Sequence, residues 1–299
     1  MDLHPAGFTT SEAFGTSGNQ QVGYAGIMES GLELRAMLWS GTAASAIDLH
    51  PAAGYQNSIA ESVSANTQVG AGINSLGNLE WTSHALMWRS TAESIVSLHP
   101  SGFQTSYATA VEGEWQAGYG KKEGVERALL WQGTADSVVD LHPAGLRRSK
   151  VHGMSETSQV GAGTNLNPHA LLWHGTADSV VDLHPAGYLS SQAFDASVDT
   201  QVGIAVTQNG RERAMAWNGT SESAIDLHEM LQGLGFNLRD SRAIGISENG
   251  DIVGWAYDGT RGYAIKWTLV PEPPSIAILL LAIPALISMS RAGRRGRRE

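Results

Sequence analysis

Six histidines return at nearly even spacing along the chain, and imidazole is the side chain best suited to proton transfer and metal binding near neutral pH. They are His4, His50, His99, His142, His184 and His228. Five precede a proline, which favours extended backbone, so Leu-His-Pro is typical of a strand end whose imidazole bonds a neighbouring backbone group. A ring of His and Asp could in principle hold cations at a shared axis. Because Ser97 and Glu229 break the pattern and no copy adds a second ligand, we predict a structural role, with no catalytic, cofactor-binding or metal-binding residue.

Residues that depart from the repeat are better candidates for ligand contact than residues present in every copy. The tentative ligand contacts are Trp81, Trp115, Arg147, Arg148 and Lys150. The three cations, with His152 nearby, could dock a sulfate, uronate or phosphate group, because the rest of the chain is acidic. Further ring candidates near second strands are Trp255, Tyr24, Tyr119 and Tyr257. Glycan recognition is the hypothesis that these aromatic residues suggest.

Linear enzyme motifs are missing from the sequence. It contains no Gly-x-Ser-x-Gly, no His-Glu-x-x-His, no Walker loop and no Gly-x-Gly-x-x-Gly that opens a helix. Catalytic residues can still converge from separate repeats, so two alternatives to a binding module stay open. One is a secreted polysaccharide lyase or hydrolase, and the other is a purely structural repeat without a small ligand.

The positions of six tryptophans reveal the elements that carry these residues. Each copy runs from a Leu-Trp-like strand end through a Gly-Thr-Ala turn and an apolar run to Asp-Leu-His-Pro, and the copies are marked by Trp39, Trp88, Trp131, Trp173, Trp217 and Trp267. Spacings of 49, 43, 42, 44 and 50 residues are typical of a four-stranded propeller blade. We therefore predict an all-β, six-bladed β-propeller over 1–268, with each of these tryptophans buried between blades.

One unit illustrates the predicted meander. Strands are expected at 106–111, 115–120, 127–131 and 137–141, joined by short links that contain glycine. Asn209-Gly210 and Asn249-Gly250 predict two-residue hairpin turns elsewhere. The segment Glu229–Gly235 is expected to form a helical turn, because its apolar residues fall at helical spacing.

The two ends of the array look complementary. The chain begins with Asp-Leu-His-Pro, whereas the sixth unit stops at Trp267 without that segment. We expect the N-terminal segment to complete the outer edge of the last blade and close the ring. An open stack, or a larger propeller whose seventh blade lies in a missing N-terminal part, remains the alternative.

The composition restricts the possible binding partners but does not indicate the cellular compartment. The formal charge is −10, and since the last nine residues carry +4, about −14 is left for the rest. A body this acidic would repel nucleic acid. Cysteine is absent, so neither a disulfide nor a thiolate metal site can form, and redox chemistry cannot indicate a compartment.

The C-terminal residues have the composition of a membrane-targeting tail. A Pro-rich linker at 269–275 precedes an apolar run at 276–290, which we predict to be a short transmembrane helix. The tail at 291–299 is rich in arginine and contains Arg291, Arg294, Arg295, Arg297 and Arg298. The positive-inside rule would leave this tail in the cytoplasm and the repeats outside.

This three-part tail resembles the PEP-CTERM sorting signal of exported bacterial proteins, with Pro271, Glu272 and Pro273 as its recognition motif. The resemblance implies export, recognition by an exosortase-type membrane processing enzyme and cleavage near the motif. Before cleavage the protein would be anchored in the cell-envelope membrane, and afterwards it would lie at the cell surface or in the extracellular matrix. Exported proteins of this kind begin with a signal peptide, so we expect the natural start to lie upstream of Met1.

The repeats resemble the HAF family of bacterial extracellular repeats, through His84-Ala-Leu-Met-Trp88, His169-Ala-Leu-Leu-Trp173 and the recurring Gln-Val-Gly strands at 68–70, 159–161 and 201–203. The family's phenylalanine is replaced in every copy. The resemblance implies a fold and an extracellular location, and it implies no particular chemical activity. We therefore predict a cell-surface or extracellular-matrix binding or structural module without a cofactor, and extracellular polysaccharide is its candidate ligand.

Overall fold

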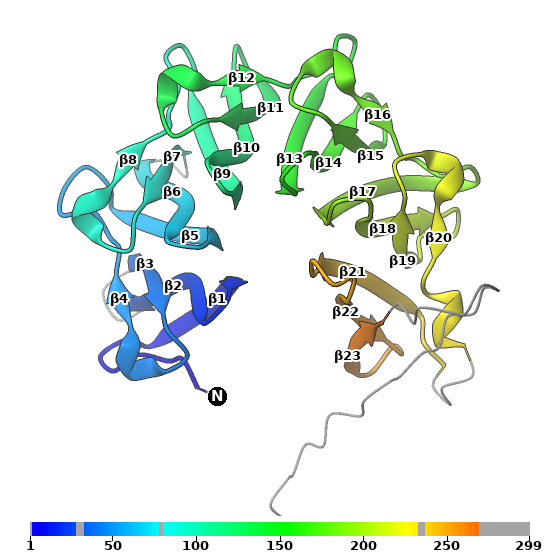
Figure 1. The fold of residues 1–299 in the computed structure, drawn as a ribbon, viewed down its shortest axis with the longest axis horizontal. Helices are drawn as coiled ribbons and strands as arrows, with labels where there is room; N and C mark the ends of the chain where they lie inside the picture. Colours follow the sequence, from blue (N-terminus) through cyan, green and yellow to red (C-terminus); the bar gives the residue numbers. More distant parts are fainter. Residues whose placement is uncertain (1, 28–32, 78–79, 233–236, 269–299) are drawn as a thin grey trace, which may run out of the picture.

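Six small antiparallel sheets stand side by side around a common axis (Figure 1). The computed structural model describes residues 2–27, 33–77, 80–232 and 237–268. The predicted all-β propeller with six repeats is confirmed, and each of the first five sheets is a four-stranded meander. The predicted C-terminal helix, the sorting motif and the arginine tail lie outside the described residues. Within these described ranges, no helix has the length and apolar character needed to cross a membrane.

The sheets are numbered as blades 1 to 6 in chain order. Blade 1 holds β1 (Thr10–Ser17), β2 (Gln20–Ile27), β3 (Glu33–Trp39) and β4 (Ile47–Asp48). Blade 2 holds β5 (Asn57–Ser64), β6 (Thr67–Gly77), β7 (Glu80–Trp88) and β8 (Val96–Ser97). Blade 3 holds β9 (Thr105–Glu112), β10 (Trp115–Lys122), β11 (Val125–Trp131) and β12 (Val139–Asp140).

The remaining blades repeat this order. Blade 4 holds β13 (Arg148–Met154), β14 (Gln159–Thr164), β15 (Pro168–Trp173) and β16 (Val181–Asp182). Blade 5 holds β17 (Tyr188–Ala196), β18 (Gln201–Thr207), β19 (Glu212–Trp217) and β20 (Ile225–Asp226). Blade 6 holds β21 (Asp240–Ile246), β22 (Ile252–Tyr257) and β23 (Gly262–Trp267), and among the described residues it has no fourth strand.

The fourth strand of a blade is shorter than the sequence predicts. In blade 3 the predicted strand 137–141 is reduced to β12, because the 3-10 turn η3 (Ala135–Ser137) precedes it. The Ser137 hydroxyl donates to the Thr134 carbonyl oxygen at 2.6 Å, which holds the turn closed. Equivalent turns are η1 (Ala43–Ser45), η2 (Ala92–Ser94), η4 (Ala177–Ser179) and η5 (Ser221–Ser223).

Two further local predictions can be compared with the structure. The segment after His228 does form the 3-10 turn η6 (Glu229–Leu231), as expected. The Asn-Gly hairpins differ, because 208–210 is a three-residue loop in which Thr207 N donates to Arg211 O and Gly210 alone has a positive φ, at 78°. A type I turn followed by a left-handed glycine accounts for this geometry without a positive φ at Asn209.

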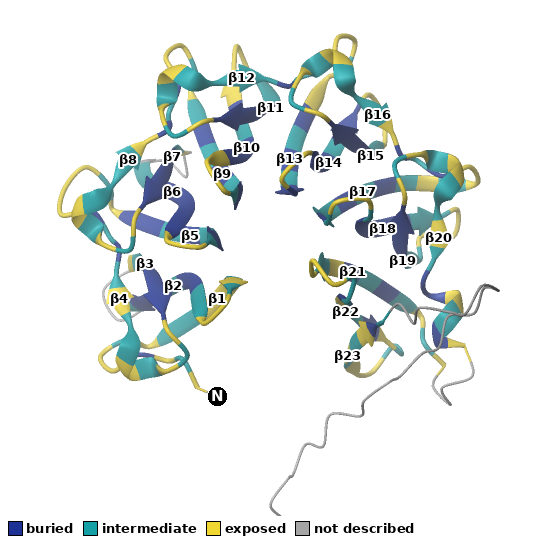
Figure 2. Cartoon of the chain, viewed as in Figure 1, coloured by how far each residue is buried: buried dark blue, intermediate teal, exposed yellow. Residues whose placement is uncertain are grey.

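The core consists of the interfaces between blades, where Figure 2 shows the buried residues concentrated on the middle strands. Trp131 is fully buried and packs with Val69 and Met87 of the preceding blade. The repeated tryptophans are all at most 3% exposed, and five of them lie against the preceding blade as predicted, whereas Trp39 packs against the N-terminal residues Leu3 and Phe8. Removing such a ring would cost about 3–5 kcal/mol.

A hydrogen-bonded latch joins each blade to the one before it. The Ser149 hydroxyl accepts from the buried Ala128 N–H of blade 3 at 3.0 Å and lies 2.8 Å from His142 Nδ1. Because the hydroxyl oxygen is the acceptor for Ala128, its own hydrogen is free for Nδ1, which leaves the imidazole proton on Nε2. His142 Nε2 then donates to the Leu146 carbonyl oxygen at 3.1 Å, so every polar atom of the latch is paired.

The latch recurs at four other junctions, which explains the regular histidines. The equivalent serine–histidine pairs are Ser58 with His50, Ser106 with His99, Ser191 with His184, and Ser241 with His228. Each of these serines also accepts a backbone N–H from the third strand of the preceding blade. At the start of the array, His4 Nδ1 bonds Ser11 at 2.9 Å in the same way, but no described blade precedes it.

The ring is an open arc, and here the expected closure is wrong. The N-terminal segment lies against blade 1, where Leu3 and Phe8 pack on Met37 and Trp39, and Figure 1 shows a gap between blades 1 and 6. A cavity of about 750 Å³, lined by the segment 4–8 and by Met37, lies on this free side of blade 1, where other blades receive a neighbour.

The free side of blade 6 carries a charged residue where other blades are apolar. Lys266 aligns with Leu38, Met87, Leu130, Leu172 and Ala216, all of which are buried at blade interfaces. The Lys266 side chain is 48% exposed and pairs with Asp251 at 2.8 Å. A polar end face is what keeps the last unit of a repeat array soluble.

Candidate functional site on the hairpin face

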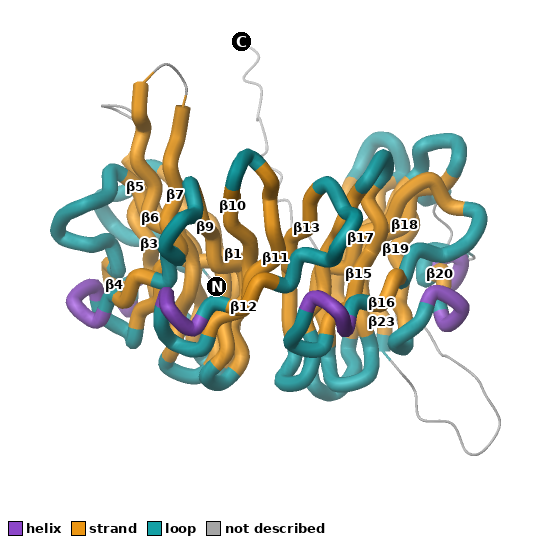
Figure 3. Tube along the Cα trace, turned by 90° about the horizontal axis from the view of Figure 1, so that it is seen from above, coloured by secondary structure: helices purple, strands orange, loops and turns teal. Residues whose placement is uncertain are grey.

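The propeller has two faces that differ in charge. One, called the hairpin face, is formed by the hairpins between second and third strands and by the links between blades. The other, called the turn face, is formed by the turns η1–η5 and the hairpins between first and second strands (Figure 3). Of the 14 lysines and arginines in the described ranges, only Arg89 and Lys266 lie toward the turn face. The other 12 lie toward the hairpin face, which is therefore the face suited to an anionic ligand.

Four of these cations form a patch on two neighbouring blades. Lys121 and Lys122 end β10, whereas Arg147 and Arg148 lie where β13 begins, and all four side chains belong to exposed residues. None of the four forms an ion pair with a carboxylate in the part of the chain that the structure describes. We call this set the blade 3–4 patch. Lys122 Nζ lies 5.6 Å from the centre of the Phe103 ring, but no carboxylate of the described residues neutralises the four charges.

An aromatic strip lies beside the patch, on the innermost strands β9 and β13 and on the second strand β10. The Tyr107 and Tyr119 rings stack with centroids 5.7 Å apart and planes 10° from parallel. Lys150 Nζ lies 4.1 Å from the centre of the Tyr119 ring, within the range of a cation–π interaction. The strip thus extends the patch inward with phenol groups and one ammonium group.

Two carboxylates hold the strip in place. The Tyr107 hydroxyl donates to Glu61 Oε1 of blade 2 at 2.6 Å, and Lys150 Nζ pairs with Glu126 Oε1 of blade 3 at 2.8 Å. Burial raises the pKa of Glu61 above its usual range, although the bond from Tyr107 opposes this, and burial raises the pKa of Tyr119 to about 12. Both phenols are therefore neutral donors at physiological pH, which suits binding rather than nucleophilic chemistry.

Two residues of the strip, Tyr107 and Lys150, occupy a highly variable position of the repeat. The residue that follows the latch serine differs in every blade: Glu12, Ile59, Tyr107, Lys150, Gln192 and Arg242. Since the fold tolerates all six side chains at this position, the position is free to carry local function. Sequence reasoning singled out Lys150 and Tyr119 but missed Tyr107, Glu61 and Glu126, and this variable position was the signal that could have found Tyr107.

The structure separates the tryptophan candidates. Trp81 is 55% exposed and begins the third strand of blade 2 toward the hairpin face, whereas Trp115 is 37% exposed and begins β10 at the turn face. They cannot form one stacking platform, because they project from opposite faces. Arg147, Arg148 and Lys150, by contrast, follow one another along the same end of blade 4.

The other ring candidates already have partners. Tyr24 and Trp255 occupy the same repeat position as Tyr119. The Tyr24 hydroxyl donates to Glu12 at 3.0 Å, and the Arg242 guanidinium lies 5.3 Å from the centre of the Trp255 ring. An aromatic ring beside a charged group of its own blade's first strand is therefore a feature of blades 1 and 6, whereas the charged group beside Tyr119 of blade 3 is Lys150 from the first strand of blade 4.

Buried titratable groups near the axis join blades and do not face one another. Asp195 accepts from the Ile246 N–H of blade 6 and from the Ala196 N–H, and burial raises its pKa to about 6. His152 Nδ1 bonds the Ala193 carbonyl oxygen of blade 5 at 3.0 Å, and burial lowers its pKa. In the described ranges, no group of three or more His, Asp or Glu residues is arranged to hold a metal ion.

Comparison with known proteins identifies the fold only. No family model matches the chain, and no curated protein matches it. Among solved structures it is similar to the β-propeller domain of the Trilobed protease from Pyrococcus furiosus, a domain with an open velcro topology, at 11% identity and a TM-score of 0.52 over 75% of this chain and 69% of that one.

Two hydrolases show the same likeness. A puromycin-hydrolyzing peptidase from Mycobacterium tuberculosis is 13% identical with a TM-score of 0.51, and a puromycin hydrolase is 9% identical with a TM-score of 0.50. These matches cover 84% and 89% of this chain, but the chain spans only 42% and 46% of the two hydrolases. At such low sequence identities the similarity shows a β-propeller fold and gives no information on activity.

Proposed function

We propose that this chain is an exported binding module that holds an acidic polysaccharide on the hairpin face. The observation that carries the proposal is the blade 3–4 patch, in which four exposed cations have no carboxylate partner in the described structure although the whole chain has a net charge of −10. A uronate-containing polymer presents one carboxylate per charged sugar, and a row of cations can contact several at once.

The aromatic strip adds selectivity to this electrostatic attraction. The Tyr107 and Tyr119 rings offer apolar surface beside the patch, and the Tyr119 hydroxyl and the Lys150 ammonium group offer hydrogen-bond donors, a combination that suits sugar rings bearing acid groups. The Tyr107 hydroxyl donates to Glu61, but burial raises the pKa of both phenols, so they stay protonated and we favour binding over a polysaccharide lyase or hydrolase.

Export and sorting belong to the same proposal and rest on the sequence. The resemblance of Pro271, Glu272, Pro273 and the following apolar and arginine-rich segments to a PEP-CTERM signal supports recognition by an exosortase-type enzyme. The protein would then act at the cell surface or in the extracellular matrix, where acidic polysaccharides occur. Intact-mass analysis of each cell fraction from the native host tests this part, since export with cleavage predicts loss of the C-terminal mass outside the cell.

The binding proposal is tested with polygalacturonate and with neutral dextran of similar length. We expect polygalacturonate to bind, dextran not to bind, and incubation to release no new reducing ends or unsaturated sugars. Equal affinity for both polymers would contradict the role of the patch. Cleavage products that grow with enzyme concentration would instead favour the lyase or hydrolase alternative.

A further inference from the structure

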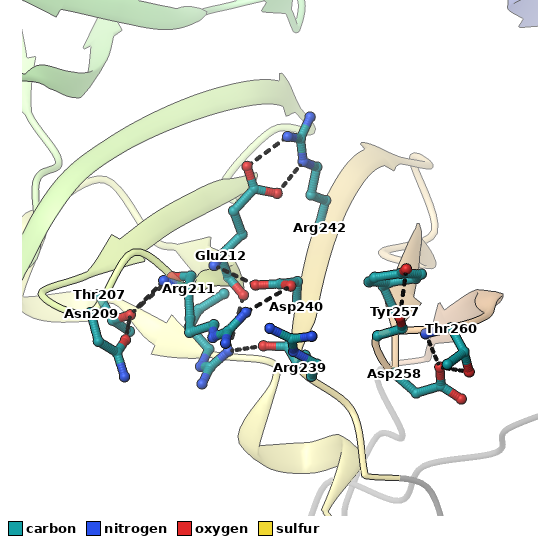
Figure 4. Close-up of polar contacts among 12 residues, drawn as sticks. Thr207, Asn209, Arg211, Glu212, Arg239, Asp240, Arg242, Tyr257, Asp258 and Thr260 are labelled. Atoms are coloured by element: carbon teal, nitrogen blue, oxygen red, sulfur yellow. Dashed lines mark hydrogen bonds and ion pairs between the residues drawn. The ribbon is translucent and has the colours of Figure 1, made fainter.

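The hairpin face of blades 5 and 6 carries a second group of cations, formed by Arg211, Arg239 and Arg242 (Figure 4) and by Arg213, which bonds the Arg239 carbonyl oxygen. They come from four segments: the hairpin before β19 (Arg211), β19 itself (Arg213), the end of the link before β21 (Arg239), and β21 (Arg242). We call this set the arginine cluster. The fold brings its segments together because β19 and β21 belong to neighbouring packed blades.

Only two of the four guanidiniums are paired with a carboxylate. Arg242 forms a two-bond pair with Glu212, at 2.5 and 2.6 Å, and Arg211 Nη1 lies 3.7 Å from Asp240 Oδ2, a long contact. Asp240 Oδ1 also accepts the Glu212 N–H at 3.1 Å. The two acidic groups of the cluster are therefore already engaged.

The other two guanidiniums are positioned by the backbone. Arg213 Nη1 donates to the carbonyl oxygens of Arg239 at 2.7 Å and Glu212 at 3.1 Å, which fixes its direction without neutralising its charge. The Arg239 side chain lies against Gly259, where an added Cβ would come within 2.8 Å of its Cδ. Neither arginine forms an ion pair with a carboxylate of the described residues, so the cluster holds surplus positive charge.

We propose that the arginine cluster is a binding site for a compact oxoanion, such as a sulfate or phosphate ester group. A guanidinium presents paired donors that match the oxygens of such a group, and a fixed guanidinium loses less freedom on binding than a lysine does. Arg239, which is exposed, and Arg211, which is partly exposed, supply the donors, and the charge of Arg213 adds to the attraction. The site is separate from the blade 3–4 patch and does not depend on the polysaccharide proposal.

A thermal-shift titration with sodium sulfate and sodium phosphate, at constant ionic strength adjusted with chloride, tests the site. We expect both anions to raise the melting temperature of the wild-type chain in a saturable manner. The variants Arg211→Gln and Arg239→Gln should weaken the apparent affinity at least tenfold. Arg239→Lys keeps the charge but loses the fork of donors, so an intermediate loss is expected.

Two controls separate this site from the other proposal. Arg89→Gln removes the same charge from the turn face and should not change the response to sulfate. Arg147→Gln removes it from the blade 3–4 patch, so it should weaken the binding of polygalacturonate while the arginine cluster keeps its saturable response to sulfate. Arg239 is exposed, and Arg211 is partly exposed and makes only a long contact of 3.7 Å with Asp240, so both variants should fold with a melting temperature close to that of the wild type in chloride. A wild-type chain that does not respond, or cluster variants that respond like the wild type, would overturn the proposal whatever happens with polygalacturonate.

Discussion

Ser149→Ala should loosen the junction between blades 3 and 4 far more than its small change in volume suggests. Ser149 is 1% exposed, and its hydroxyl is the acceptor for the fully buried Ala128 N–H. Alanine leaves that N–H without an acceptor inside the protein, at a cost of about 1–3 kcal/mol, and removes the bond to His142, worth about 1 kcal/mol. The expected loss in the free energy of unfolding is therefore about 2–4 kcal/mol.

The repeat provides a matched control for this variant. Ser11→Ala is the same change at the same repeat position, but Ser11 bonds only His4, because no described blade precedes it. We expect a loss of about 0.5–1.5 kcal/mol there. Urea unfolding of both variants, followed by tryptophan fluorescence, measures the difference. If Ser149→Ala loses no more than Ser11→Ala, the latch does not join the blades in the way described.

The latches and the buried Asp195 should give stability opposite dependences on pH. Burial lowers the pKa of His142, so as the pH falls this histidine is protonated in the unfolded chain before it is protonated in the folded protein. The latch therefore contributes its full stability above about pH 6.5, and this contribution is lost as the pH falls. His142→Gln should therefore flatten the fall in urea midpoint between pH 7.5 and 5.5, and an unchanged slope would count against the latch. The pKa of Asp195, raised to about 6, means that its contribution falls as the pH rises from about 4 to 6. Asp195→Asn should remove this fall in stability, which is worth up to about 3 kcal/mol. If the asparagine amide does not accept from the Ile246 N–H, the variant is instead destabilised at every pH.

Most of the fold could be predicted from the sequence because the residues that each blade needs recur in every copy of the repeat. The tryptophan spacing indicated the blades, and the Leu-His-Pro pattern indicated a strand end with a bonded imidazole. The serine partner of each histidine was missed, since it lies seven or more residues away in the chain and is recognised only when two blades are packed together.

The open arc could also have been predicted, although it was not. Lys266 stands at a position that is apolar in the other five copies, and Thr16 replaces residues such as Val63 and Val111 on the free side of blade 1. Charged or polar residues at both ends are unfavourable for a closed interface. The complementary motifs at the two chain ends, which favoured a closed ring, were given more weight than Lys266 and Thr16, which disfavour it.

The candidate sites were predictable only in part. The basic run 147–150 was visible as a local departure from the repeat, but its neighbours Lys121 and Lys122 belong to another blade and join it only through the fold. Trp81 and Trp115 were not distinguished in the sequence. Their strands run in opposite directions in the meander, which places the two rings on opposite faces. The arginine cluster likewise assembles from separate segments.

The central claim, that the hairpin face binds an acidic polymer, is tested most directly by comparing equal charge losses on the two faces. The affinity of polygalacturonate would be measured at several salt concentrations for Arg147→Gln, Arg148→Gln and Arg89→Gln. The first two variants should bind more weakly and show a smaller dependence on salt, whereas Arg89→Gln should match the wild type, because screening limits its influence to its own face. Equal effects of all three variants would contradict a ligand held by the hairpin face.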